Sequence, residues 1–321
     1  MKQTILFLSI VIFLSCTKEI ELKQKPAEPK LVLNSIIMAG KEINAHISHT
    51  KDLFDSTDCW VNDALVYLFA NGTFMGNLAA QIDSTGWYKS EFIAQEGTEY
   101  RFEVIKSGYE SVSGKAIVPT VVSISSASID LNSFIYYNDN SSDTTYGWSY
   151  NLSFDDRDAM DDYFEIQSIS LGRNYFGKKV IGLLNHPFAF DPVFSSEDYI
   201  AFNPNQFVFS DNSFNGGNTT IEMKMQNTYG GGGDTLAYNM AYEDINEQGY
   251  YLVLRHISKS YYEFVKSWVK HYTNRQFGNS FDDLIFKGLA GNPVPLYSNV
   301  ENGYGIVAAF SQSYRHVPVN E

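Results

Sequence analysis

The chain has 321 residues, with 23 Lys plus Arg against 37 Asp plus Glu, and a formal net charge of −14 at pH 7. This excess of acids argues against binding to nucleic acid or to anionic lipid head groups, because both need clustered basic residues. With only two cysteines, a disulfide framework is excluded, but the length is sufficient for two hydrophobic cores.

The first segment has the pattern of an export signal. Lys2 precedes ten residues, 5–14, that are apolar apart from one serine. Ten residues are too few to cross a hydrocarbon core of roughly 30 Å, which needs about 20 in a helix. We therefore expect residues 1–15 to be a cleaved signal peptide. The sequence FLSC, ending at Cys16, resembles a bacterial lipobox and implies lipidation of Cys16 as the anchor. The alternative is an ordinary signal peptide with an incidental cysteine.

The next segment is polar, and it is followed by residues that alternate between apolar and polar. Residues 16–30 are rich in Lys, Glu and Gln, as expected of a tether. From residue 31 to residue 120, short alternating runs are separated by turn signals such as Asn71-Gly72. Short strands at intervals of about 8–12 residues predict a β-sandwich domain over residues 31–120. Cys59 lies in this region without a nearby basic residue or His, so we expect a buried small hydrophobe.

Three short motifs in this region occur in a recognisable order. They are Gly86-Trp87-Tyr88, Gly97-Thr98-Glu99-Tyr100 and Gly108-Tyr109. The pattern resembles the prealbumin-like and carboxypeptidase-regulatory-like β-sandwich modules. The resemblance implies a non-catalytic immunoglobulin-like or prealbumin-like sandwich.

Residues 121–321 are predicted to form a larger β-rich domain, so the fold class is mainly β. Aromatic strands alternate there with polar loops rich in Gly and Asn. The candidate strands are 146–154, 163–171, 206–209, 219–226 and 249–257.

One amphipathic helix is predicted over Ser260–Arg275. Apolar residues recur there at i, i+3, i+4, i+7, i+8 and i+11, which gives one continuous stripe. Ser260 and Glu263 fit a capping box at its start. We expect Trp268 to be a core anchor that holds the helix on a sheet. An exposed stripe that binds a partner is the alternative.

Two groups of residues raise the question of a metal ion. His46 and His49 are three residues apart in a predicted strand, so they point to opposite faces and cannot share an ion. Carboxylates concentrate in one predicted loop, where they could hold calcium. These acids are Asp155, Asp156, Asp158, Asp161 and Asp162. Because the EF-hand pattern is absent, a solvated acidic turn is the preferred interpretation, and we assign no metal and no cofactor.

The sequence contains no recognisable catalytic constellation. There is no Gly-x-Ser-x-Gly elbow and no Cys with a neighbouring His, so we expect no enzymatic activity. A catalytic pair of carboxylates far apart in the chain, as in glycosidases, is an alternative that the sequence does not exclude. Aromatic residues make up 15% of the chain, and those in predicted loops are candidates to contact a small-molecule, peptide or glycan ligand. They are Tyr136, Tyr137, Tyr146, Phe188 and Phe190.

Four Asp-Ser/Thr-x segments in predicted loops resemble the Bacteroidota O-glycosylation acceptor pattern. The candidate acceptors are Ser56, Ser84, Thr144 and Thr235.

A second resemblance covers nearly the whole chain. NPVPLYSNVENGYGIVAAFSQS (292–313) and YYLVLRHISKSYYEFVKSW (250–268), with the lipoprotein-like start, resemble a Bacteroidota outer-membrane lipoprotein family. That family is catalogued as domain of unknown function 4249, and its members are commonly encoded beside TonB-dependent receptors. The resemblance implies a lipid-anchored accessory protein that captures or takes up a substrate with a receptor barrel. The alternative is a structural or adhesive cell-envelope lipoprotein without a transport partner.

The residues after Cys16 also bear on location. Lys18, Glu19 and Glu21 resemble the acidic signal that follows the lipidated cysteine in surface-exposed Bacteroidota lipoproteins, although Ile20 interrupts the acids. The resemblance implies that the protein faces the cell exterior. The alternative is a hydrophilic tether.

Overall fold

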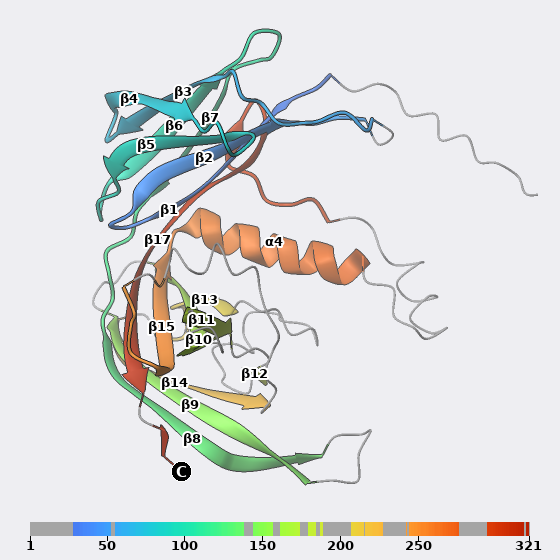
Figure 1. Ribbon diagram of the computed structural model, residues 1–321. Coiled ribbons are helices and arrows are strands. Elements are labelled where there is room, and N and C mark those ends of the chain that lie inside the picture. Colours follow the sequence, from blue (N-terminus) through green and yellow to red (C-terminus); the bar gives the residue numbers. More distant parts are fainter. Residues whose placement is uncertain are drawn as a thin grey trace, which may run out of the picture.

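The computed structural model of the protein describes most of the chain from residue 28 onward. The described residues are 28–52, 55–137, 144–156, 161–173, 179–183, 187–188, 207–214, 216–226, 242, 244–275, 294–317 and 319–320. Their fold is mainly β, as predicted, and they include one α-helix, α4 (Figure 1).

The first seven strands lie close together in the sequence. They are β1 (Leu31–Met38), β2 (Glu42–His49), β3 (Leu65–Ala70), β4 (Thr73–Ala80), β5 (Trp87–Ile93), β6 (Glu99–Ile105) and β7 (Val112–Ile117). The remaining elements are β8 (Ile124–Tyr137), β9 (Thr144–Asp156), β10 (Tyr163–Arg173), β11 (Lys179–Leu183), β12 (Pro187–Phe188), β13 (Phe207–Ser210), β14 (Gly217–Gln226), β15 (Gly249–Ile257), α4 (Lys259–Arg275), β16 (Val300–Glu301), β17 (Tyr304–Val317) and β18 (Val319–Asn320).

The strands form two sheets. The 13-stranded sheet has the order β11-β10-β15-β17-β1-β2-β5-β4-β3-β6-β7-β16, and β13 pairs with β10 beside this path. The 5-stranded sheet has the order β12-β14-β9-β8-β18. In Figure 1 the large sheet runs from the N-terminal strands at the top through β17 and β15, and the small sheet lies at the bottom.

The N-terminal strands share one hydrophobic core. Alternating residues of β1 and β2 are buried, which is the pattern that the sequence predicted for a half-buried strand. Strands β3, β6 and β7 contribute to the same core, and so do Val300, Val307 and Ala309. The core therefore draws on residues outside the predicted domain of residues 31–120. The prealbumin-like classification stays a prediction.

Strand β17 connects the two parts of the molecule. It pairs parallel with β1 from Val32↔Tyr304 to Met38↔Phe310, and antiparallel with β15 from Ile257↔Phe310 to Tyr250↔Val317. Gly305 permits the close approach to β1, because its φ is +117° and an added Cβ would lie 2.0 Å from the backbone oxygen of Leu33.

Strands β10 and β15 are buried on both faces. On one face, Phe164, Ile166, Leu252 and Leu254 pack against residues of β8, β9 and β14 in the small sheet. On the other face, Ile169, Leu171 and Val253 pack around Tyr242 and Ile245. This double burial explains the nearly continuous apolar sequence of β15, because neither face needs polar residues for contact with water.

Helix α4 begins one residue earlier than the sequence predicts, and its cap differs. The Ser258 hydroxyl accepts hydrogen bonds from the backbone N of Tyr261 at 3.3 Å and of Ala309 at 3.0 Å. The Ser260 hydroxyl instead donates to the carbonyl oxygen of Val307 at 2.9 Å. The predicted capping box of Ser260 and Glu263 is therefore wrong, because Ser258 is the residue that caps the helix.

The expected role of Trp268 is also wrong. Tyr261 and Val265 anchor α4 with exposures of 5% and 4%, whereas Trp268 is 40% exposed. The helix packs mainly on β17, and its later turns extend beyond that strand in Figure 1. Within the described residues, no helix combines the length and the apolar character needed to cross a membrane.

Candidate functional site

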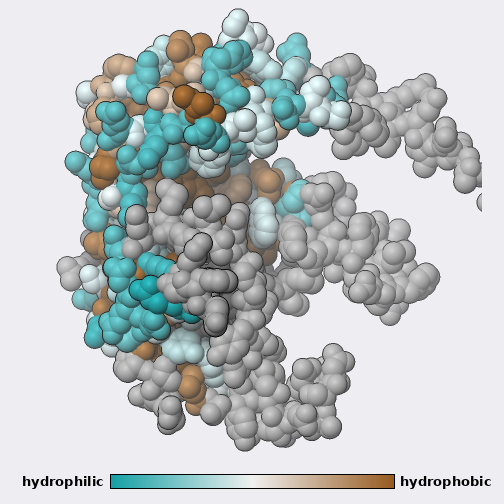
Figure 2. Space-filling view, in the orientation of Figure 1, coloured by the Kyte–Doolittle hydropathy of each residue, from teal (hydrophilic) through white to brown (hydrophobic). Residues whose placement is uncertain are grey.

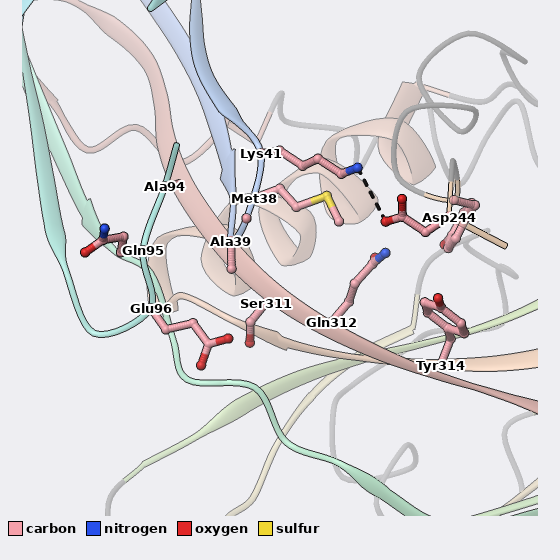
Figure 3. Close-up of a pocket in the computed structure, with 12 residues that line it drawn as sticks. Met38, Ala39, Lys41, Ala94, Gln95, Glu96, Asp244, Ser311, Gln312 and Tyr314 are labelled. Atoms are coloured by element: carbon pink, nitrogen blue, oxygen red, sulfur yellow. Dashed lines mark ion pairs between the residues drawn. The ribbon is translucent and has the colours of Figure 1, made fainter. Parts of the chain in front are cut away.

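A pocket lies where the N-terminal strands meet β17. Its volume is about 480 Å³, which is within the range of small-molecule sites. Three segments and two further residues line it: the β1–β2 turn, the residues after β5, the middle of β17, Tyr242 and Asp244 (Figure 3). In the view of Figure 2 the described surface is largely hydrophilic, with hydrophobic residues in small groups.

An ion pair joins two sides of the pocket. Lys41 in the β1–β2 turn lies 3.6 Å from a carboxylate oxygen of Asp244. The two side chains are 30% and 74% exposed, so solvent screens the pair and its contribution to stability is small. The pair instead links the N-terminal strands to the segment that precedes β15.

One residue that lines the pocket has a buried hydroxyl without a hydrogen-bond partner among the described residues. Ser311 is 1% exposed, and its Oγ makes no hydrogen bond within the described residues. Glu96 points toward Ser311 in Figure 3, and one of its carboxylate oxygens accepts a hydrogen bond from the backbone N of Val121 at 2.9 Å. A buried hydroxyl without a partner is costly, so a ligand that hydrogen-bonds to Ser311 would gain from it.

Behind the pocket, charged and polar side chains form a buried network across three strands. Glu165 of β10 is paired with Arg255 of β15, which is paired with Gln312 of β17. The Arg255 guanidinium lies 3.1 Å from a carboxylate oxygen of Glu165 and donates to the Gln312 amide oxygen at 3.2 Å. The guanidinium also stacks over the ring of Phe310, 4.5 Å from its centroid.

Two tyrosines and a glutamine complete this group, which we call the arginine network: Glu165, Gln167, Tyr242, Arg255, Tyr261 and Gln312. Arg255 donates to the Tyr242 hydroxyl at 3.2 Å, and that hydroxyl donates to Gln167. Gln167 donates to Glu165 at 2.8 Å, and Tyr261 donates to Glu165 at 3.0 Å. Each charge in the network is thus paired, and Tyr242 and Gln312 also line the pocket.

The network shifts the pKa values of Arg255 and Tyr261. Burial lowers the pKa of the Arg255 guanidinium, but Tyr242, Glu165 and Tyr261 together outweigh burial and raise it above its ordinary value. Burial, followed by the charge of Glu165, raises the pKa of Tyr261. Arg255 therefore remains a cation, and Tyr261 remains a hydrogen-bond donor.

The lining of the pocket suits noncovalent binding. It offers an ammonium, two carboxylates, amides and hydroxyls, beside apolar surface from Met38 and Tyr314. The described lining residues include no His and no Cys, so none of them provides a nucleophile–base pair with histidine. A small polar molecule with one apolar face matches this combination.

The structure locates only some of the residues singled out from the sequence. Outside the described residues lie Cys16, Lys18, Glu19, Glu21, Asp158, Phe190 and Thr235. The candidate aromatics Tyr136, Tyr137 and Tyr146 were expected in loops, but their backbone belongs to β8 and β9. Phe188 likewise belongs to β12, opposite Lys224. Pairing across β8 and β9 brings the three tyrosine positions together at one end of that hairpin.

The possible glycosylation sites differ in their settings. Ser56 and Ser84 are exposed and lie in loops, as an acceptor requires. Thr144, which was expected in a loop, begins strand β9 opposite Tyr137. Cys59 is half-buried in a loop instead of fully buried.

The histidines of β2 are held by different neighbours. The ring of His46 lies 4.9 Å from those of Trp60 and Trp87. Burial lowers the pKa of His46. His49 Nδ1 donates to the carbonyl oxygen of Thr50 at 3.0 Å.

The arginine network was missed in the sequence, although a signal was present. Glu165 and Gln167 alternate with apolar residues in YFEIQSIS, and Arg255 interrupts the apolar run of YYLVLRHI. Charges of opposite sign inside strands that are otherwise apolar indicate a buried pair.

One of two comparisons with known proteins supports the family resemblance that was inferred over nearly the whole chain. No curated protein matches the chain. The model of one family, described as "Domain of unknown function (DUF4249)", matches residues 17–315, and the chain therefore belongs to this family.

Proposed function

We propose that this protein is a non-enzymatic, lipid-anchored outer-membrane protein that faces the cell exterior and captures a small ligand for a TonB-dependent receptor. The observation that carries the proposal is the apolar run of residues 5–14, which continues into the lipobox-like sequence FLSC that ends at Cys16. A cysteine with several acyl chains gives stable membrane anchoring without a spanning helix.

The pocket at β17 supports the capture of a ligand. It has the volume of a small-molecule site, a buried hydroxyl without a partner at Ser311, and polar groups from both parts of the molecule. Because its walls come from segments far apart in the sequence, a bound ligand would contact the N-terminal strands and β17 together.

The anchor is tested by producing the wild type and Cys16→Ala in a bacterium that makes outer-membrane lipoproteins. We expect the intact mass of the wild type to show loss of residues 1–15 and added acyl chains, and the protein to fractionate with outer membranes. Cys16→Ala should carry no lipid. A wild-type protein with an unmodified thiol at Cys16 would contradict the anchor. The same spectra report glycosylation at the four candidate acceptors.

The orientation is tested separately. Replacing Lys18, Glu19 and Glu21 by Ala should leave the protein lipidated but protect it from protease added to intact cells. Equal cleavage of the variant and the wild type would exclude these residues as a surface-export signal.

Ligand capture is tested by native mass spectrometry of protein purified from its host. We expect a small molecule to accompany the wild type, and to be lost in Ala39→Trp, which fills the pocket. Gln95→Trp is the matched control, because Gln95 borders the pocket but its side chain points away from it in Figure 3. Loss of the molecule in both variants, or its absence from the wild type, would contradict the assignment of the pocket.

The transport partner is tested by a native pull-down in mild detergent through a C-terminal tag. Co-purification of a receptor barrel is the expected result. Recovery of the lipoprotein without any barrel would favour a structural or adhesive role in the cell envelope.

A further inference from the structure

Three aspartates lie together on the face of β10 and β15 opposite to the arginine network. Asp156 is the last residue of β9, Asp162 directly precedes β10, and Asp211 directly follows β13. The backbone N of Asp211 donates to the carbonyl oxygen of Asp162 at 3.0 Å, which fixes two of the three positions. We call Asp156, Asp162 and Asp211 the aspartate cluster.

The cluster is compact and buried. One carboxylate oxygen from each residue lies within 4.8 Å of those from the other two. Asp211 is 0% exposed and Asp156 is 2% exposed. Mutual repulsion and loss of hydration both oppose two buried carboxylates beside the partly buried Asp162, so their charge must be compensated.

Hydrogen bonds satisfy only part of the cluster. Asp156 accepts from the backbone N of Gly216 at 3.0 Å, and Asp162 lies 3.0 Å from His256 Nε2. Neither carboxylate oxygen of Asp211 has a hydrogen-bond partner within the described residues. A fully buried carboxylate without partners is rare in proteins and requires an explanation such as a bound ion.

His256 supplies at most one positive charge. Its Nδ1 lies 2.8 Å from the carbonyl oxygen of Thr120, which can only accept, so Nδ1 carries a proton. Nε2 faces Asp162, and the two groups either share a second proton or form an ion pair. At most one of the three carboxylates is compensated in this way.

We propose that Asp156, Asp162 and Asp211 form a binding site for one hard divalent cation of the calcium type. All three offer oxygen ligands, which calcium prefers, at distances of about 2.3–2.6 Å. Ligands on opposite sides of one such ion are about 4.6–5.2 Å apart, so the observed spacing of up to 4.8 Å fits. No thiolate belongs to the group, and His256 is engaged by Thr120 and Asp162, so zinc is not indicated.

The ion would connect the two sheets. Asp156 belongs to the 5-stranded sheet, whereas Asp162 and Asp211 flank strands of the 13-stranded sheet. Binding of calcium at this point therefore stabilises the contact between the sheets. The role is structural and is independent of the pocket and of the proposed transport function.

The site is tested with the purified full chain in detergent, stripped with EDTA and titrated with calcium chloride. We expect equilibrium dialysis to give one calcium ion per chain. We also expect the melting temperature to rise by several degrees at calcium concentrations about a hundredfold above the dissociation constant. A wild type that takes up no calcium at millimolar concentrations would overturn the proposal, and would indicate that a proton compensates Asp211.

Asp211→Asn is the decisive variant. It should weaken calcium binding at least about tenfold and abolish most of the rise in melting temperature. In EDTA it should melt at or above the temperature of the wild type, because it removes a buried carboxylate without partners. That measurement distinguishes loss of the site from failure to fold.

Two neighbouring acids provide matched controls. Asp155 and Asp161 each adjoin a member of the cluster in the sequence, but both are exposed. Asp155→Asn and Asp161→Asn should bind calcium as the wild type does. Loss of calcium binding in either control equal to that in Asp211→Asn would exclude the cluster as the site.

Discussion

The arginine network and the aspartate cluster occupy opposite faces of the same two strands and differ in how their charges are satisfied. Glu165 and Asp211 are both 0% exposed. Glu165 receives hydrogen bonds from Arg255, Gln167 and Tyr261, whereas Asp211 receives none within the described residues.

The difference shows that burial of a charge does not by itself indicate function. A buried ion pair with complete hydrogen bonding is a self-contained part of the core. A buried carboxylate such as that of Asp211, with no partner within the described residues, requires a further component, and this makes the aspartate cluster the place to look for a ligand.

The largest effect is expected from Arg255→Met. It leaves the Glu165 carboxylate buried without its cation, which should lower the free energy of unfolding by about 3–5 kcal/mol. Urea denaturation measures the change. The double variant Glu165→Leu/Arg255→Met should be more stable than Arg255→Met alone, because no unpaired charge remains. A double variant that is equally unstable would mean that packing, and not charge, determines the loss.

A smaller loss is expected from Tyr261→Phe. Removing the hydroxyl deletes one hydrogen bond to the charged Glu165, which is worth about 1.5–3 kcal/mol. Tyr304→Phe is the control, because Tyr304 is 53% exposed, and it should change stability by less than about 0.5 kcal/mol. Equal effects in denaturant titrations would argue against a closed network around Glu165.

On the opposite face, His256→Phe tests whether His256 compensates the charge of the aspartate cluster. It keeps a ring against Phe164, which lies 5.2 Å away, but removes the hydrogen bonds to Thr120 and Asp162. In calcium-free buffer we expect a loss of about 1–2 kcal/mol. Saturating calcium should reduce this loss, since the ion replaces the missing positive charge. The same loss in both buffers would show that His256 does not compensate the cluster.

The smallest effect is expected at the pocket. Ser311→Ala removes a hydroxyl without a partner and should change the free energy of unfolding by less than about 0.5 kcal/mol, or raise it. Ser260→Ala removes a buried hydroxyl that donates to Val307 and should cost about 1 kcal/mol. If Ser311→Ala is the more destabilising of the two, the hydroxyl has a partner and is not free for a ligand.

Local pattern was sufficient to predict many elements. The strand at Gly249–Ile257 matches its prediction, and the helix differs by one residue at its start. The cap was misassigned because Glu263, three residues after Ser260, favours Ser260 over Ser258 in the local sequence. The choice between Ser258 and Ser260 depends on Ala309 and Val307, about 50 residues away.

The sites were less accessible to prediction, because distant segments build them. The sequence identified Asp156 and Asp162 as part of an acidic loop, but Asp156 belongs to β9 and Asp161 and Asp162 lie in the connection before β10. Asp211 joins them only through the pairing of β13 with β10. The pocket likewise depends on the parallel pairing of β1 with β17, for which no local pattern exists.

The pairing of β1 with β17 also sets an order of assembly. Met38 and Tyr304 are separated by 266 residues (304 − 38) in the chain. Ribosomes add about 5–20 residues per second, so roughly 13–53 s pass between the synthesis of the two strands. During that interval β1 lacks the neighbour that covers its outer edge, and an uncovered edge readily pairs with other chains. Aggregation through this edge is therefore avoided if folding is delayed until both strands have been synthesised.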